Sequence, residues 1–108
     1  MICLFLISSP EYNSSYSSLF KNAIDWVSRK TGDEAPMATY RGKVAAIMAA
    51  SLGSLGGMRV LVVLRMLMKN LCTMVLPNQK TLGGDITNEK TEKALKDLGA
   101  EPVDTLKN

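Results

Sequence analysis

The sequence has 108 residues, which is enough for one small domain with a modest hydrophobic core. Its 13 Lys and Arg against 10 Asp and Glu give a net charge of +3, and the basic residues are scattered, which argues against nucleic-acid binding. There is no His, and the two Cys show no CxxC spacing, so the sequence predicts no metal site and no Ser-His or Cys-His catalysis.

Residues 2–7 form an unbroken apolar run, ICLFLI, which ends at Ser8-Ser9-Pro10. A short, non-alternating apolar run that is closed by turn residues predicts a strand buried on both faces, as in a parallel sheet. The run has no basic flank and is too short for a signal-peptide core, which favours a soluble, cytoplasmic protein. The apolar residues at 19, 20, 23, 24 and 27 then share one face of a helix over residues 19–29, with Ser17 or Ser18 as its N-cap.

The middle of the chain predicts a second strand and a second helix. Residues 43–50, KVAAIMAA, form the strand, although the alanines would also suit a helix. The helix over residues 57–70, GMRVLVVLRMLMKN, is apolar on almost every side, and Arg65 and Lys69 share a narrow polar stripe. Its apolar part is too short and too interrupted by Arg to span a membrane. A second apolar face needs another partner, so we expect a homo-oligomer, a dimer or tetramer, formed through residues 19–29 and 58–70.

The last third of the chain predicts a third strand over residues 73–76, closed by Pro77, and a charged, amphipathic helix over residues 88–98. Three strand–helix units in succession predict an α/β fold with a parallel sheet. Cys3 and Cys72 each lie singly in an apolar run, so we expect two buried thiols.

Two unusual segments follow the first two strands, and ligands of open α/β sheets bind outside the carboxyl ends of the strands. Residues 9–15, SPEYNSS, offer backbone polar groups, the ring of Tyr12 and the amide of Asn13, which suit a flat heteroaromatic ring. An ordinary strand-to-helix turn explains them equally well. Residues 51–57, SLGSLGG, place three glycines before a helix, which suits an anion or an electron-rich ring edge, with Arg59 adding charge. Glycines that only turn the chain are the commoner explanation.

Taken in order, these segments resemble a known family. PEYNSSYSSLFKNAIDW, residues 10–26, is similar to the signature of NADPH-dependent FMN reductases and their azo-, quinone- and chromate-reducing relatives. GKVAAIMAASLGSLGGMR, residues 42–59, resembles their second ligand loop, and MVLPNQ, residues 74–79, resembles their last strand. Leu52 departs from the pattern, because relatives usually have Pro after the Ser.

The resemblance implies a flavodoxin-like three-layer α/β sandwich and a flavin-dependent NAD(P)H oxidoreductase. In such a protein FMN passes a hydride from NADPH or NADH to a small electron acceptor, and no catalytic side chain is required. The cofactor-binding residues that the resemblance implies are those that border the flavin ring: Pro10, Glu11, Tyr12, Asn13, Ser51, Gly53, Gly56 and Gly57. Lys21, Asn22 and Asp25 are implied to shape the loop and the subunit contact.

Members of the family begin with a strand and a Ser/Arg-rich loop that grips the FMN phosphate, and we expect this chain to lack both. In the flavodoxin-like strand order 2-1-3-4-5 it then supplies the equivalents of strands three, four and five. Residues 1–108 are therefore predicted to form a partial flavodoxin-like domain, with residues 2–7 as an apolar edge strand. The alternative to a working reductase is a non-catalytic truncated member, or an oligomerising module, that does not bind FMN.

Overall fold

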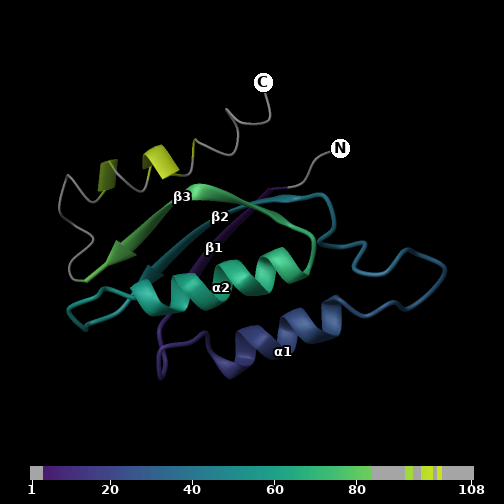
Figure 1. Cartoon of the computed structure of the whole chain (residues 1–108), viewed down its shortest axis with the longest axis horizontal. Coiled ribbons are helices and arrows are strands. Elements are labelled where there is room, and N and C mark those ends of the chain that lie inside the picture. Colours follow the sequence, from purple (N-terminus) through teal and green to yellow (C-terminus); the bar gives the residue numbers. More distant parts are fainter. Residues whose placement is uncertain (1–3, 84–91, 94–95, 99, 101–108) are drawn as a thin grey trace.

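The computed structural model describes residues 4–83, 92–93, 96–98 and 100. Strands and helices alternate in it, in the order β1 (Leu4–Pro10), α1 (Ser18–Val27), β2 (Val44–Ala50), α2 (Met58–Asn70) and β3 (Met74–Leu82). The strands form a parallel sheet of order β1-β2-β3, with both helices on one side of it (Figure 1). The predicted α/β fold with a parallel sheet is confirmed.

Strand β2 is the buried centre of the sheet. The side chains of Ala45, Ala46 and Ile47 have no exposed area, and β2 pairs with a neighbour on each side. Burial on both faces and pairing on both edges override the helical preference of alanine, so the strand predicted over residues 43–50 is confirmed.

Helix α1 begins where the sequence predicts. The Ser17 hydroxyl accepts a hydrogen bond from the Phe20 amide at 3.1 Å, which is the expected N-cap contact. Ile24 is buried against the sheet, whereas Leu19 and Trp26 are 78% and 73% exposed. The helix therefore presents apolar side chains on its outer face as well as on its inner face.

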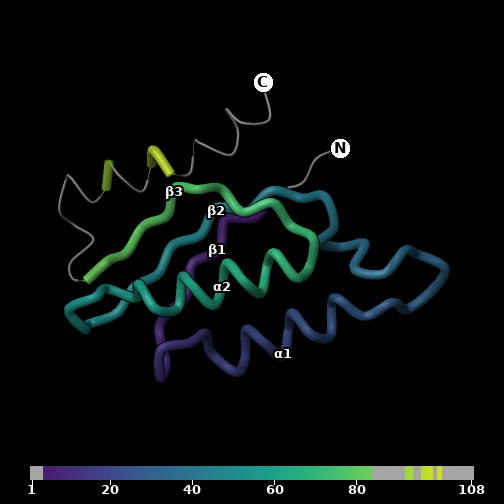
Figure 2. The backbone as a smooth tube through the Cα atoms, viewed as in Figure 1, coloured from purple at the N-terminus to yellow at the C-terminus, as the bar shows by residue number. Residues whose placement is uncertain are grey.

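Helix α2 packs through Val60, Leu61, Leu64 and Met68 into the same core cluster as Ile24 and the β2 residue Ile47. Figure 2 shows α1 and α2 on the same side of the sheet, running in roughly the same direction. Both helices therefore form one layer. Of the two core clusters among the described residues, the larger lies between this layer and the sheet.

Helix α2 ends in a Schellman motif. The amide of Cys72 donates to the carbonyl of Lys69 at 2.9 Å, and the amide of Thr73 donates to that of Met68 at 3.1 Å. Cys72 adopts the left-handed conformation, with φ of +62°, and is exposed. The prediction of a buried thiol is wrong for Cys72, because the helix end turns its side chain outward; Cys3 lies outside the described residues.

On the opposite face of the sheet, Leu98 is the described residue of the C-terminal segment that belongs to a core cluster with the strands. Leu98 is buried there with Val44, Ala46 and Leu76. The described residues of this segment, 92–93, 96–98 and 100, are helical, while the rest of the helix predicted over residues 88–98 lies outside the described residues. Layers on both faces complete the three-layer arrangement.

The outer strands differ from the predictions. Strand β1 continues to Pro10, three residues past the predicted end, and Leu6 is 55% exposed, because β1 is an edge of the described sheet. The prediction of burial on both faces is therefore wrong for β1, whereas that of an apolar edge strand is confirmed for residues 4–7.

Strand β3 does not end at Pro77 but continues to Leu82. The pairing changes from Ala45 with Val75 to Ile47 with Gln79, so two steps along β2 match four steps along β3. Pro77 lies inside this irregularity, where the missing amide hydrogen costs no ladder hydrogen bond. The predicted strand end is thus wrong, since a bulge on an outer strand accommodates the proline.

Candidate functional site at the carboxyl ends of β1 and β2

The loop after β1 contains a tight two-residue turn. The amide of Tyr12 donates to the carbonyl of Ser15, and the amide of Ser15 donates to that of Tyr12, both at 2.9 Å. The central residues Asn13 and Ser14 have φ of +50° and +66°, as a type I′ turn requires. Asn tolerates this conformation better than most residues, which explains the choice at position 13.

This turn determines which groups of the loop remain available to a ligand. The backbone amide and carbonyl of Tyr12 are used within the turn. The amides of Asn13 and Ser14 make no hydrogen bond to another described residue, and the Tyr12 ring is 60% exposed. The loop therefore offers the exposed ring of Tyr12, the exposed side chain of Asn13 and two backbone donors that no described residue engages, on a preorganised backbone.

The glycines of the loop after β2 fall into two classes. Gly56 and Gly57 are buried, with φ of +58° and +96°. A Cβ on Gly57 would lie 2.8 Å from the Cβ of Ala49, and one on Gly56 would lie 3.2 Å from the Gly83 amide nitrogen. These two glycines are required by the close approach of the loop to β2 and to the end of β3.

Gly53 has no such requirement. A Cβ there would have the Ser51 Oγ, at 3.7 Å, as its nearest neighbour, and the backbone does not adopt a positive φ. The Ser51 hydroxyl accepts a hydrogen bond from the Gly53 amide at 3.3 Å. Local packing therefore does not require glycine at position 53. The space that a side chain would occupy there is open apart from the Ser51 Oγ.

Glu11 connects the loop after β1 to the start of α2, directly after the second loop. Its carboxylate Oε1 accepts a hydrogen bond from the Val60 amide at 2.8 Å, in the first turn of α2. We expected an anion or an electron-rich edge near this helix N-terminus, and in the structure a carboxylate of the chain itself lies there. The sequence gives no local signal for this contact, since the two residues are 49 positions apart.

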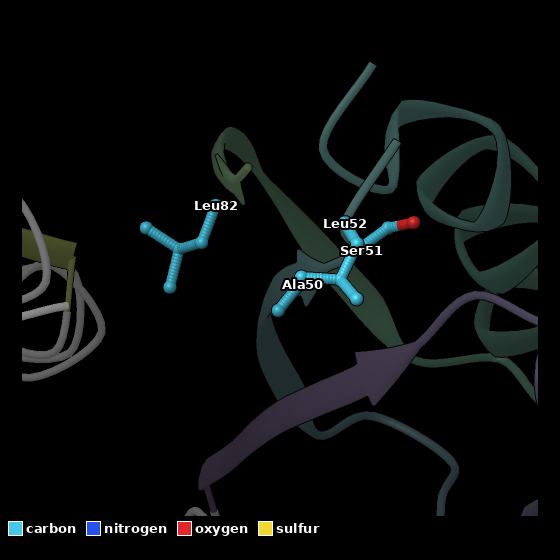
Figure 3. A pocket seen from close by; sticks show the side chains of 4 residues that line it. All are labelled: Ala50, Ser51, Leu52 and Leu82. Atoms are coloured by element: carbon cyan, nitrogen blue, oxygen red, sulfur yellow. The ribbon is translucent and has the colours of Figure 1, made fainter. Parts of the chain in front are cut away.

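A cavity of about 210 Å³ opens at the ends of β2 and β3. It is lined by Ala50, Ser51 and Leu52 on one side and by Leu82 on the other (Figure 3), and the Ser51 amide donates to the Leu82 carbonyl at 3.0 Å. The sequence did not indicate Leu82, because the predicted third strand ended at Pro77, and Ala50 was predicted only as the last residue of the second strand. The volume is below the usual 300–1,000 Å³ of a small-molecule site, so the cavity is at most part of one.

The eight predicted site residues belong to the segments at the carboxyl ends of β1 and β2, but they differ in access. Pro10, Tyr12, Asn13 and Gly53 are exposed, Glu11 and Ser51 are half-buried, and Gly56 and Gly57 are buried.

Two charged side chains of α1 pair with each other along the helix. Lys21 and Asp25 form an ion pair of 2.8 Å, one turn apart, and the hydrogen bond to Asp25 raises the pKa of Lys21. Asn22 is exposed on the same helix.

Within the part of the chain that the structure describes, no cluster of His, Cys, Asp and Glu could hold a metal ion. No helix in that part is long and apolar enough to cross a bilayer.

Comparisons with known proteins agree with this geometry. The family model described as NADPH-dependent FMN reductase matches residues 4–87. The quinone reductase of Escherichia coli (strain K12) is 39% identical over 84 residues, which are 78% of this chain and 42% of that protein. An NAD(P)H-dependent FMN reductase of Pseudomonas aeruginosa is 46% identical over 54 residues, which are 50% of this chain and 26% of that protein.

Among solved structures, the flavoenzyme NAD(P)H:(acceptor) oxidoreductase FerB from Paracoccus denitrificans superimposes with a TM-score of 0.72 at 29% identity. The match covers 88% of this chain and 56% of FerB. The chain thus spans less than half the length of the curated relatives it matches and slightly more than half of this solved structure.

Proposed function

Because the chain belongs to the NADPH-dependent FMN reductase family, we propose that it forms the flavin-ring side of an NAD(P)H-dependent oxidoreductase site. The proposed reaction passes a hydride from NADPH or NADH through FMN to a small acceptor of the quinone type. One observation carries the proposal: the loop at Pro10–Asn13 and the loop at Ser51–Gly57 lie at the same sheet edge and are joined by the contact between Glu11 and Val60.

The residues present fit a flat flavin ring. The backbone amides of Asn13 and Ser14, which make no hydrogen bond to another described residue, suit the carbonyl and ring-nitrogen acceptors of such a ring. The open space above Gly53 allows a planar group to lie close to the backbone. Tyr12, with its exposed ring, supplies an aromatic surface for stacking.

In the proposal the residues of the two loops bind, shield or position the flavin ring. Bound FMN would supply the hydride chemistry itself, so a site without His is chemically sufficient. Tyr12 would exclude water from one side of the ring, and the Ser51 hydroxyl would orient the Gly53 amide. Gly56 and Gly57 act indirectly, by holding the loop against β2 and β3.

The proposal is tested by titrating FMN with the purified chain and following the quenching of flavin fluorescence. Saturable quenching at micromolar protein, followed by NAD(P)H oxidation with a quinone acceptor, is the expected result. Gly53→Val should weaken FMN binding, because the side chain would occupy the open space, whereas Ala38→Val, in the exposed loop at the other end of the sheet, should not. Absence of quenching by the folded wild-type chain would reject the proposal.

We further propose that the protein is a homo-oligomer in the cytoplasm. Met58, Val62 and Met66 follow one another at every fourth position on the exposed side of α2, and Leu19 and Trp26 are exposed on α1. Such apolar stripes are typical of an interface between subunits. Sedimentation should give a dimer or tetramer, and Val62→Glu should shift it toward the monomer.

These stripes also favour the second candidate function, an oligomerising module that does not bind FMN. The two functions differ in one measurement. A chain that sediments as an oligomer but does not quench flavin fluorescence would support the module and exclude the reductase site.

A further inference from the structure

The side chain of Glu11 reaches from the loop after β1 to the first turn of α2. We propose that Glu11 is a positioning residue, which fixes the two loops of the candidate site against each other and occupies the place where the N-terminus of α2 would otherwise bind an anion. This inference goes beyond the ring-bordering role that the family resemblance implies for Glu11.

The N-terminus of α2 lacks a cap of its own. Its N-cap residue is Gly57, which has no side chain to accept a hydrogen bond, and the first turn contains no acidic residue. The Met58 amide donates to the Leu55 carbonyl at 3.1 Å, and the Leu61 amide reaches the Gly57 carbonyl only at 3.4 Å. The Val60 amide, which has no partner within the helix, is satisfied by Glu11 at 2.8 Å. Glu11 therefore takes over the capping role that a residue such as Asp or Ser usually has.

The charge of Glu11 reinforces this role. The N-terminus of a helix carries a partial positive charge, so a carboxylate at this position is stabilised by the helix dipole as well as by the hydrogen bond. A second anion at the same helix end would be repelled by the carboxylate and would find the Val60 amide already engaged. In the proposal, the carboxylate thus keeps the Val60 amide from an external anion.

The backbone around Glu11 is held from both sides. Pro10, directly before it, is paired in the sheet with Ala50, and the tight turn that begins at Tyr12 follows directly after it. Because Glu11 has little backbone freedom, its side chain transmits the position of the first loop to α2. Loss of the carboxylate would therefore let the two loops move relative to each other.

Three variants separate positioning from a general effect on stability. Glu11→Ala removes the acceptor, and Glu11→Gln retains an amide oxygen that can accept the same hydrogen bond. Thr73→Val is the matched control, because it removes a buried hydrogen bond of 3.0 Å from Thr73 Oγ1 to the Tyr40 carbonyl at the opposite end of the sheet. The control should lower the thermal midpoint without touching either loop.

The first measurement is hydrogen exchange of the Val60 amide by NMR on the full chain. Exchange is expected to be faster by about tenfold or more in Glu11→Ala, with most of the protection kept in Glu11→Gln and Thr73→Val. The second is the thermal midpoint in millimolar sodium sulfate against sodium chloride at equal ionic strength. Only Glu11→Ala is expected to gain a saturable stabilisation by sulfate, because only there is the helix N-terminus open.

The third measurement rests on the proposed function. FMN affinity is expected to fall by about fivefold to tenfold in Glu11→Ala and to stay within about twofold of wild type in Glu11→Gln and Thr73→Val. Wild-type exchange at Val60 in Glu11→Ala, or a saturable sulfate response in the wild-type chain, would overturn the role of Glu11. A wild-type chain that does not bind FMN would reject the proposed function instead, and the exchange and sulfate results would still decide the role of Glu11.

Discussion

Gly57→Ala should destabilise the fold strongly, whereas the same change at Gly53 should not. Gly57 has φ of +96°, and an added Cβ would lie 2.8 Å from the Cβ of Ala49 and 3.3 Å from the Ala50 amide nitrogen. The left-handed backbone costs an Ala residue roughly 1–2 kcal/mol. Overpacking against a buried strand costs a further 1–3 kcal/mol or so. The free energy of unfolding should therefore fall by about 2–5 kcal/mol.

This loss is large for a chain of this size. Domains are stabilised by roughly 0.05–0.15 kcal/mol per residue, or about 5–16 kcal/mol for 108 residues. Urea denaturation followed by circular dichroism measures the change. With a denaturant dependence of about 2 kcal/mol per molar urea, in the middle of the usual range, the midpoint should drop by about 1–2.5 M.

Gly53→Ala is the matched comparison within the same loop. Its Cβ would meet the Ser51 Oγ at an ordinary 3.7 Å, and its φ needs no glycine. The free energy of unfolding should change by no more than about 0.5 kcal/mol. An unchanged urea midpoint for Gly57→Ala, or an equal drop for both variants, would refute the division of the glycines into packing and open positions.

Three further changes test other parts of the structure. Cys72→Gly should raise the free energy of unfolding by about 1 kcal/mol in urea titrations, because glycine relieves the left-handed residue that ends α2; no gain would contradict the assigned helix end. Ser14→Gly should raise it by about 0.5–1 kcal/mol, since Asn-Gly is the preferred pair for a type I′ turn, and a loss would argue against that turn. Burial raises the pKa of Tyr40 above 10.0, so the unfolded chain loses that proton first and the stability conferred by neutral Tyr40 should decline as the pH rises above about 10. Tyr40→Phe should remove this part of the alkaline decline in thermal midpoints measured from pH 8 to 11, and an identical decline in the variant would contradict the assignment.

The features that the sequence predicts well are those with a local physical cause. Small residues in an unbroken apolar run fit a strand covered on both faces, which is what β2 is. The spacing of apolar residues predicts α1, and a Ser before its first turn predicts where that helix starts. Each of these signals lies within about one turn or one strand of the residue that it describes.

The features that the sequence does not predict depend on contacts between distant segments. Pro77 taken alone predicts the end of a strand. Strand β3 continues to Leu82 because its pairing with β2 shifts around the proline. Cys72 has apolar neighbours, yet the geometry of the helix end directs it outward. The role of Glu11 depends on an amide 49 positions away, which no local pattern indicates.

The candidate site combines both kinds of feature, and this determines how its residues should be interpreted. The pattern of three glycines predicts a ligand loop, but the structure explains Gly56 and Gly57 by their packing against β2 and β3. Of the three glycines, Gly53 is the one that packing does not require. It lies next to Ser51, which lines the cavity at the ends of β2 and β3. In the same way, Glu11 belongs to the predicted ligand loop but is engaged by Val60, which leaves Tyr12 and the amides of the turn to face a ligand. We therefore expect a residue of a ligand motif to contact the ligand only where the fold has not already engaged it, and by that criterion we propose the surface between Tyr12 and Gly53 at this sheet edge.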